Sequence, residues 1–193
     1  MKRTALLSTL LFLAGCVGLG EHVIRESYDM AKLKSGHALV LMSITNRQAN
    51  YLNGLNQFPP SFSIRNRKTG GSFEAEGLIG KVNDLHIVNA KDWPIGRVIV
   101  LELPAGHYEV FDYDTPRVPG HLYSKAKRQE PLMAFSALDG EAIYIGNLDV
   151  YFESREKSRL TISDEQERDS RYVTLKWPNL RPSSFKKRLA EML

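Results

Sequence analysis

Short apolar segments separated by turn residues run through the middle of this chain, and they constrain its fold more than any other feature. Residues 37–45 are almost wholly apolar, as in a strand buried on both faces, and residues 61–67 alternate apolar with polar side chains, as in a half-buried strand. Residues 97–103 are rich in Val, Ile and Leu and end at a proline, which cannot donate a ladder hydrogen bond. This pattern predicts an all-β domain over residues 36–162.

Turns rich in Gly and Pro are expected to join most of these strands into hairpins. The Asp139-Gly140 dipeptide is among the strongest short hairpin signals, and Gly106 in the Pro104-Ala105-Gly106 turn is free to take a positive φ. The expected hairpins pair residues 61–67 with 73–76, residues 97–103 with 107–113, and residues 131–138 with 141–152. Shorter strands are expected at residues 85–88 and 159–162, and a long surface loop at residues 114–129.

The C-terminal part of the chain carries helical signals. Residues 163–166, Ser-Asp-Glu-Gln, have the spacing of a capping box, which predicts a helix over residues 164–176. Ser184 is expected to cap a second helix. We therefore expect a β-sandwich followed by one or two C-terminal helices within residues 163–193. The apolar side of the second helix would be formed by Phe185, Leu189 and Met192.

The N-terminal segment has the layout of a secretory signal. Lys2 and Arg3 precede an apolar run over residues 5–14, and small residues lead to Cys16, the single cysteine of the chain. The apolar run is shorter than the roughly 20 residues that a transmembrane helix needs. A cysteine can also be a small apolar side chain inside such a run, but Cys16 stands at its end, where a signal peptidase cuts.

The segment Leu13-Ala14-Gly15-Cys16 resembles the lipobox of bacterial lipoproteins. The resemblance implies cleavage between Gly15 and Cys16, a diacylglycerol on the Cys16 sulfur and acylation of the new amino group. Val17, where an Asp retains Gram-negative lipoproteins at the inner membrane, implies the outer membrane. Several acyl chains make such an anchor effectively permanent, since each buried methylene contributes about 0.8 kcal/mol. We expect a signal peptide over residues 1–15 and a tether over residues 16–35.

The net charge and the cysteine content limit which partners and which reactive sites are expected for this chain. The net charge of +4 comes from 26 Lys and Arg against 22 Asp and Glu, and removal of Lys2 and Arg3 leaves 24 against 22. An exported, nearly neutral chain is not expected to bind nucleic acid. With Cys16 modified, no thiol remains for a disulfide, a nucleophile or a metal site. The basic clusters at residues 65–68 and 186–188 are expected to be solvated, with contact to lipid or lipopolysaccharide phosphates as the alternative.

The turn at residues 103–108, Leu-Pro-Ala-Gly-His-Tyr, resembles a leucine-proline-x-glycine-x-tyrosine turn of small extracytoplasmic domains of the transthyretin-like and Ig-like type. Residues 140–148 and the tail with Trp177-Pro178 are similar to uncharacterised bacterial lipoproteins of this sort. The resemblance covers about residues 36–180. It implies a transthyretin-like or Ig-like β-sandwich and carries no activity, cofactor or ligand with it.

Candidates for catalysis and metal binding are few. No two of the five histidines are spaced as His-x-His or His-x-x-x-His, and no serine lies in Gly-x-Ser-x-Gly. Asp84 and His86 would share one face of a strand as an acid–base or metal pair, although a surface pair is the simpler interpretation. Glu102 and Glu109 would face each other as paired carboxylates, although solvent-facing residues of a half-exposed sheet explain them more simply. We therefore expect no catalytic residue, metal site or cofactor.

The two tryptophans and the anchor decide between the functional hypotheses. Trp93 and Trp177 could stack on sugar rings in a glycan- or peptidoglycan-binding module and would then be exposed, whereas packing in the core is the simpler interpretation. The leading hypothesis is a non-enzymatic lipoprotein that is anchored through Cys16 and faces the periplasm. It would meet an unidentified envelope protein through a sheet edge or through the loop at residues 114–129. The remaining alternative is a periplasmic hydrolase, with a pocket that holds convergent carboxylates or His86.

Overall fold

The computed structural model describes residues 22–48, 61–75, 95–114, 130–152 and 158–193. The described residues form two five-stranded sheets and one α-helix, which confirms a predominantly β domain with a helix near its C-terminus. No helix among them is long and apolar enough to span a membrane. The signal segment, the strand expected at residues 85–88 and residues 115–129 of the expected loop lie outside the described residues.

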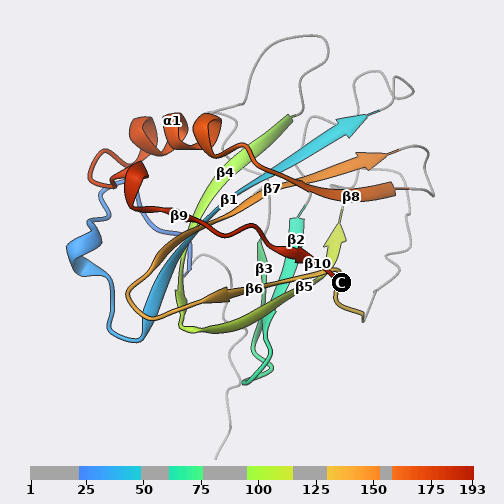
Figure 1. The fold of residues 1–193 in the computed structure, drawn as a ribbon, viewed down its shortest axis with the longest axis horizontal. Helices are drawn as coiled ribbons and strands as arrows, with labels where there is room; N and C mark the ends of the chain where they lie inside the picture. The colour runs from blue at the N-terminus through green and yellow to red at the C-terminus, as the bar shows by residue number, and fades with distance from the viewer. Residues whose placement is uncertain (1–21, 49–60, 76–94, 115–129, 153–157) are drawn as a thin grey trace, which may run out of the picture.

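Two sheets, A and B, pack on each other, and helix α1 (Gln166–Lys176) covers the outer face of sheet A (Figure 1). Sheet A contains β1 (His37–Gln48), β4 (Ile95–Pro104), β7 (Ala142–Phe152), β8 (Ser158–Ser163) and β9 (Lys186–Lys187). Its order is β4-β1-β7-β8, and β9 pairs with the first part of β7. Sheet B contains β2 (Ser61–Asn66), β3 (Ser72–Ala75), β5 (Gly106–Asp114), β6 (Met133–Ala137) and β10 (Glu191–Met192), in the order β10-β6-β5-β2-β3.

Strand β1 lies at the centre of the domain, between two apolar clusters. It pairs antiparallel with β4 and parallel with β7, and its residues 38–45 are all buried, as predicted. One face of β1 packs against sheet B and the other against α1 and the segments beside it, because side chains alternate along a strand. The cluster between the sheets includes Val40, Met42, Phe62, Tyr108, Val110 and Met133. The outer cluster includes Leu39, Leu41, Tyr144, Val173, Trp177 and Phe185.

Two of the three predicted hairpins are instead turns that cross between the sheets. Strands β4 and β7 lie in sheet A, whereas β5 and β6 lie in sheet B, so neither β4–β5 nor β6–β7 shares a ladder. The hairpin predictions at residues 104–106 and 139–140 were therefore wrong, because a tight turn serves equally well where a chain changes sheets. The predicted pairing of β2 with β3 is confirmed.

The glycines of the two crossing turns have different roles. Gly140 takes a φ of +73°, as its Asp-Gly turn suggested. Gly106 is not among the glycines with positive φ, so that expectation was wrong. A Cβ on Gly106 would instead lie 2.7 Å from Nδ2 of Asn66, and the missing side chain makes room for this close approach.

The chain after α1 is extended, so the predicted second helix after Ser184 was wrong. A short 3-10 helix, η3 (Pro182–Ser184), leads into β9, which runs parallel to β7, and β10 then pairs with β6. The N–H groups of Arg188 and Ala190 donate to the carbonyls of Tyr144 and Ile145. The C-terminal segment therefore joins an edge of sheet A to an edge of sheet B and satisfies backbone groups that a helix would leave open.

The first described residues lie along β4. The N–H of Glu102 donates to the carbonyl of His22 at 2.8 Å, and the N–H of Ile24 donates to the carbonyl of Val100 at 3.2 Å. A short 3-10 helix, η2 (Met30–Lys32), follows before β1 begins. The indole Nε1 of Trp177 donates to the carbonyl of Ile24 at 3.4 Å, which links this segment to the end of α1. From His22 onward, the segment expected to be a tether packs on the domain.

Candidate functional site

A row of polar side chains interrupts the apolar outer face of sheet A. Ser43 and Thr45 of β1 lie beside Asn147 and Asp149 of β7 in the parallel ladder. Ser43, Thr45 and Asn147 are fully buried, and Asp149 is 7% exposed. Buried polar groups need hydrogen-bond partners, so this row is the first place to look for a built site.

An irregularity in β7 places these residues on one face. Leu41 pairs with Tyr144 and Ser43 with Asn147, so two steps along β1 correspond to three steps along β7. The extra residue is a β-bulge, which reverses the side of every later side chain in its strand. Gly146 lies in the bulge with a φ of +109°, a conformation that favours glycine. The bulge therefore turns Asn147 and Asp149 toward the face that also carries Tyr144.

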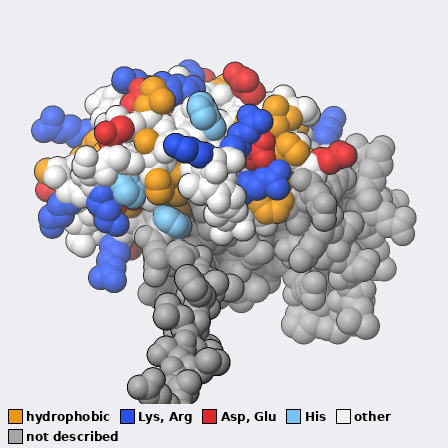
Figure 2. Space-filling view, turned by 90° about the horizontal axis from the view of Figure 1, so that it is seen from below, with side chains coloured by type: hydrophobic (Ala, Val, Ile, Leu, Met, Phe, Trp, Pro, Cys, Tyr) orange, Lys and Arg blue, Asp and Glu red, His pale blue; other side chains and the backbone are white. Residues whose placement is uncertain are grey.

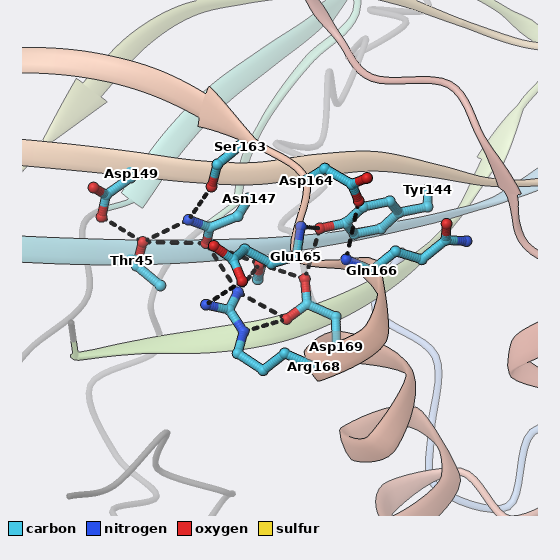
Figure 3. Close-up of polar contacts among 11 residues, drawn as sticks. Thr45, Tyr144, Asn147, Asp149, Ser163, Asp164, Glu165, Gln166, Arg168 and Asp169 are labelled. Atoms are coloured by element: carbon cyan, nitrogen blue, oxygen red, sulfur yellow. Dashed lines mark hydrogen bonds and ion pairs between the residues drawn. The ribbon is translucent and has the colours of Figure 1, made fainter. Parts of the chain in front are cut away.

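Helix α1 completes the site with two consecutive residues (Figure 3). Asp169 is fully buried, and its Oδ2 lies 2.6 Å from the hydroxyl of Ser43 and 3.0 Å from that of Tyr144. Its Oδ1 accepts from Nε and Nη2 of Arg168 at 2.9 and 2.8 Å. Nη2 of Arg168 also lies 2.8 Å from Ser43 Oγ, so the guanidinium contacts both the helix carboxylate and the sheet.

The other end of the site is held by amide and hydroxyl groups. Nδ2 of Asn147 donates to Thr45 Oγ1 at 3.0 Å and to Ser163 Oγ at 3.3 Å. The hydroxyl of Thr45 lies 2.5 Å from Oδ1 of Asp149. Figure 3 shows these side chains in one connected group that runs from β8 across β7 and β1 to the start of α1.

Burial governs the electrostatics of the site. Loss of solvent raises the pKa of Asp169 above its ordinary value, although the Arg168 charge and the bonds from Ser43 and Tyr144 act in the opposite direction. Burial also raises the pKa of Tyr144, and the neighbouring Asp169 charge adds to the effect. The Tyr144 hydroxyl is therefore held protonated, as a donor to Asp169.

This arrangement connects helix α1 to sheet A through the carboxylate of Asp169. Both carboxylate oxygens are occupied by donors of the same chain. The hydroxyl of Ser43 is hydrogen-bonded to Asp169, Asn147 and Arg168, and no histidine is among these partners. Within the described ranges, no group of three or more His, Cys, Asp and Glu is placed to hold a metal ion.

The start of α1 differs from the predicted capping box. Glu165 stands at the N-cap and makes no side-chain capping bond. The N–H of Glu165 donates to the Tyr144 hydroxyl at 3.0 Å, and the N–H of Gln166 donates to Asp164 at 3.2 Å. Ser163 still belongs to β8 and accepts from Asn147, so it does not cap the helix. The capping-box prediction was wrong because the sheet supplies the partner for the helix terminus.

The candidate site residues expected from the sequence lie elsewhere. Trp177 is 1% exposed and packs in the outer cluster, so its indole offers no surface for a sugar ring. Glu102 lies in sheet A and Glu109 in sheet B, so the two do not form the expected carboxylate pair. The sites expected at Cys16, Asp84, His86 and Trp93 lie outside the described residues.

The two basic clusters are bound to carboxylates of the domain. Arg65 and Arg67 both contact Glu109, at 3.0 and 2.9 Å. Arg188 and Lys186 contact Glu141, at 3.0 and 3.5 Å. Lys187 pairs with Asp164. Arg65 and Glu109 face each other on the paired strands β2 and β5, and the basic side chains also remain partly or fully solvated.

Sequence reasoning missed the polar site because its members are far apart in the chain. Ser43 and Asp169 are separated by 126 positions, and Thr45 and Asn147 by 102. One signal was present: Ser43 and Thr45 fall within a core strand that is otherwise apolar. Polar residues inside a strand buried on both faces require buried partners, which is a reason to look for acceptors elsewhere.

Comparisons with known proteins give little more. No family model matches the chain, and no curated protein matches it in sequence. Among solved structures, a leucine-rich repeat protein from Bacteroides thetaiotaomicron VPI-5482 aligns with 75% of this chain at 16% identity and a TM-score of 0.35. The chain spans 16% of the length of that protein. A likeness this distant assigns neither a family nor a function.

Proposed function

We propose that this chain is a lipid-anchored protein of the bacterial cell envelope, held by Cys16 at the outer membrane on its periplasmic side. Its role is non-enzymatic, as an accessory or interaction partner of another envelope protein. We also propose that its domain is a β-sandwich of the Ig-like or transthyretin-like type. Two sheets that pack on a common core, joined by turns that cross between them, support this sandwich type.

The observation that carries the non-enzymatic role is the occupancy of Asp169. This carboxylate is the most deeply buried acid of the polar site, and its two oxygens accept from Arg168, Ser43 and Tyr144. A catalytic carboxylate needs an oxygen that can reach a substrate or a nucleophile. Asp169 instead fixes α1 on sheet A, which gives a rigid domain with its exposed edges and turns free for contacts.

Membrane fractionation tests the anchor. We expect wild-type protein in the outer-membrane fraction with acyl chains incorporated from labelled palmitate. The Cys16→Ser variant would lose the label and leave that fraction, because the sulfur that carries the lipid is gone. A wild-type protein that carries no label contradicts the anchor.

Photo-crosslinking in living cells tests the role. A photoreactive amino acid at an exposed position of β8, for example in place of Thr161, would capture a protein that touches the domain. We expect one recurring envelope protein, captured from wild-type cells and not from Cys16→Ser cells. Capture of no protein, together with a hydrolytic activity that is lost in the conservative variant Arg168→Lys, contradicts the non-enzymatic role.

A further inference from the structure

The anchor and the domain meet at a defined place. The backbone bonds of His22 and Ile24 to β4, together with the Trp177 bond to Ile24, fix the chain to the domain from residue 22 onward. Six Cα–Cα steps separate Cys16 from His22, which span about 20 Å when fully extended. The diameter of a domain of this size is about twice that span. A lipid on Cys16 therefore keeps the surface around His22 close to the bilayer.

That surface is made of two segments, residues 22–35 and 175–181, which we call the anchor face. The two segments are in contact, because Trp177 bonds to Ile24 and Ser184, just beyond the second segment, lies 3.2 Å from the sulfur of Met30. Ile24, Trp177 and Leu180 also share one buried cluster, against which Tyr28, Met30 and Leu33 pack. The anchor face is therefore a packed part of the domain.

The anchor face holds the positive charge of the mature chain. Its two segments contain five Lys and Arg against two acids, whereas the rest of the mature chain has 19 against 20. Two acids border this face: the carboxylate of Glu102 accepts from the N–H of Lys34, and that of Asp139 accepts from the N–H of Gly36. Including both leaves a surplus of one. In Figure 2, Lys and Arg side chains project from the end of the described surface where residues 22–35 lie, on the left in both views. The five cations are Arg25, Lys32, Lys34, Lys176 and Arg181.

An exposed apolar side chain accompanies these charges. Leu175 is 71% exposed, more than any other large hydrophobic side chain described. Its neighbour Lys176 lies over the Trp177 ring at 5.2 Å and is half-buried. Cations together with an exposed leucine are the combination that binds a membrane surface, the cations to lipid phosphates and the leucine to the acyl boundary.

From this geometry we infer that the anchor face docks on anionic phospholipid headgroups of the membrane that holds the Cys16 lipid. The inference rests on the proposed anchor at Cys16, because the short span to His22 brings this face to the bilayer. Docking orients the domain, so that the opposite end of sheet A, with β8, points away from the membrane and toward a partner. Once the lipid holds the domain near the bilayer, the cations and the exposed leucine both favour docking.

Site-specific labelling of the lipidated full-length protein tests the docking. Because the lipid occupies the only native sulfhydryl, a single introduced cysteine can be labelled with an environment-sensitive fluorophore. Ser35→Cys lies on the anchor face, and Thr161→Cys, also exposed, lies on β8 as the matched control. In vesicles with phosphatidylglycerol, we expect the label at residue 35 to shift to the blue and to lose access to an aqueous quencher. The label at residue 161 stays accessible, and phosphatidylcholine vesicles or high salt abolish the shift at residue 35.

Charge reversal gives a second arm. Lys32→Glu with Lys34→Glu should lower the ratio of docked to undocked protein by on the order of tenfold or more. The control pair, Lys68→Glu with Arg159→Glu, makes the same change in net charge away from the anchor face and should leave docking unchanged. Equal loss in both pairs would overturn the inference, because it would show an effect of net charge alone.

Vesicle flotation separates the two proposals. Protein that floats with the vesicles while the label at residue 35 stays accessible in both lipid compositions keeps its anchor and overturns the docking. Protein that does not float and carries no lipid overturns the anchor, and the docking inference falls with it.

Discussion

The hydroxyl of Tyr144 on β7 lies 3.0 Å from Oδ2 of Asp169 on α1, and through this contact the central sheet holds its covering helix. The same hydroxyl accepts from the N–H of Glu165, at the N-cap of the helix. Tyr144 therefore satisfies a backbone donor at the helix terminus and a buried carboxylate at once. The position of α1 on sheet A depends on this residue more than on any capping side chain.

Replacement of Asp169 by Asn is expected to destabilise the domain by about 3 kcal/mol. The change leaves the Arg168 guanidinium, whose side chain is 18% exposed, beside the sheet without its carboxylate. Urea unfolding followed by circular dichroism measures the loss. Glu167→Gln, which breaks an exposed pair with Arg171, should cost no more than about 0.5 kcal/mol. Similar losses for the two variants would show that the buried pair contributes no more to the free energy of unfolding than the exposed pair.

Replacement of Tyr144 by Phe is expected to cost about 1–2 kcal/mol, because two hydrogen bonds are lost while the ring keeps its packing. The double variant with Asp169→Asn should lose less than the sum of the single losses, with a coupling of at least about 0.5 kcal/mol. Additive losses would contradict a direct role of this hydroxyl in holding the carboxylate. The same unfolding assay gives all the values.

Alanine variants of two glycines with positive φ distinguish the cost of backbone strain from the cost of a steric clash. A Cβ on Gly140, with φ +73°, meets no atom within 4 Å, whereas a Cβ on Gly146, with φ +109°, would lie 2.8 Å from Cγ2 of Ile162. We expect Gly140→Ala to cost about 1 kcal/mol and Gly146→Ala about 2–4 kcal/mol. If the two variants unfold at the same urea concentration, the bulge is not closely packed.

The C-terminal segment is expected to loosen in acid. The hydrogen bond from Arg188 holds the pKa of Glu141 below its ordinary value, and that from Lys187 does the same for the pKa of Asp164. A carboxyl group whose pKa is lowered on folding stabilises the protein fully above its unfolded pKa, near 4, and loses this contribution as pH falls through the folded value.

The matching variant is Glu141→Gln. At pH 7 it should be less stable than wild type by up to about 1 kcal/mol, because its partners are partly solvated. Well below the lowered pKa of Glu141 the two proteins should be equally stable, since the wild-type carboxyl is then protonated as well. Glu130→Gln, at an exposed position, serves as the control and should change neither value. A difference that persists at low pH would mean that packing, not charge, holds this segment.

The sequence predicted individual strands well and their partners poorly. The boundaries of β1, β2 and β4 follow from apolar patterning, which is a property of neighbouring residues. Whether a turn closes a hairpin or crosses to another sheet depends on which distant strand is available for pairing. The Asp139-Gly140 turn has the local chemistry of a hairpin, yet β7 pairs with β1, about a hundred positions earlier.

The C-terminal segment and the polar site were beyond prediction for the same reason. Phe185, Leu189 and Met192 have helical spacing, but the open edges of β7 and β6 draw this segment into extended pairing. The polar site needs the β-bulge at Gly146 to bring Asn147 to the face of Ser43. The pattern of neighbouring residues does not predict whether a distant strand has a free edge or a bulge.

The lipid on Cys16 is the central claim, and the intact mass of protein extracted from membranes tests it most directly. We expect a chain that begins at Cys16 and carries the added mass of two or three acyl chains. The Cys16→Ser variant should lack that added mass. An unmodified wild-type chain that still begins at Met1 would contradict the anchor, and with it the orientation of the domain on the membrane.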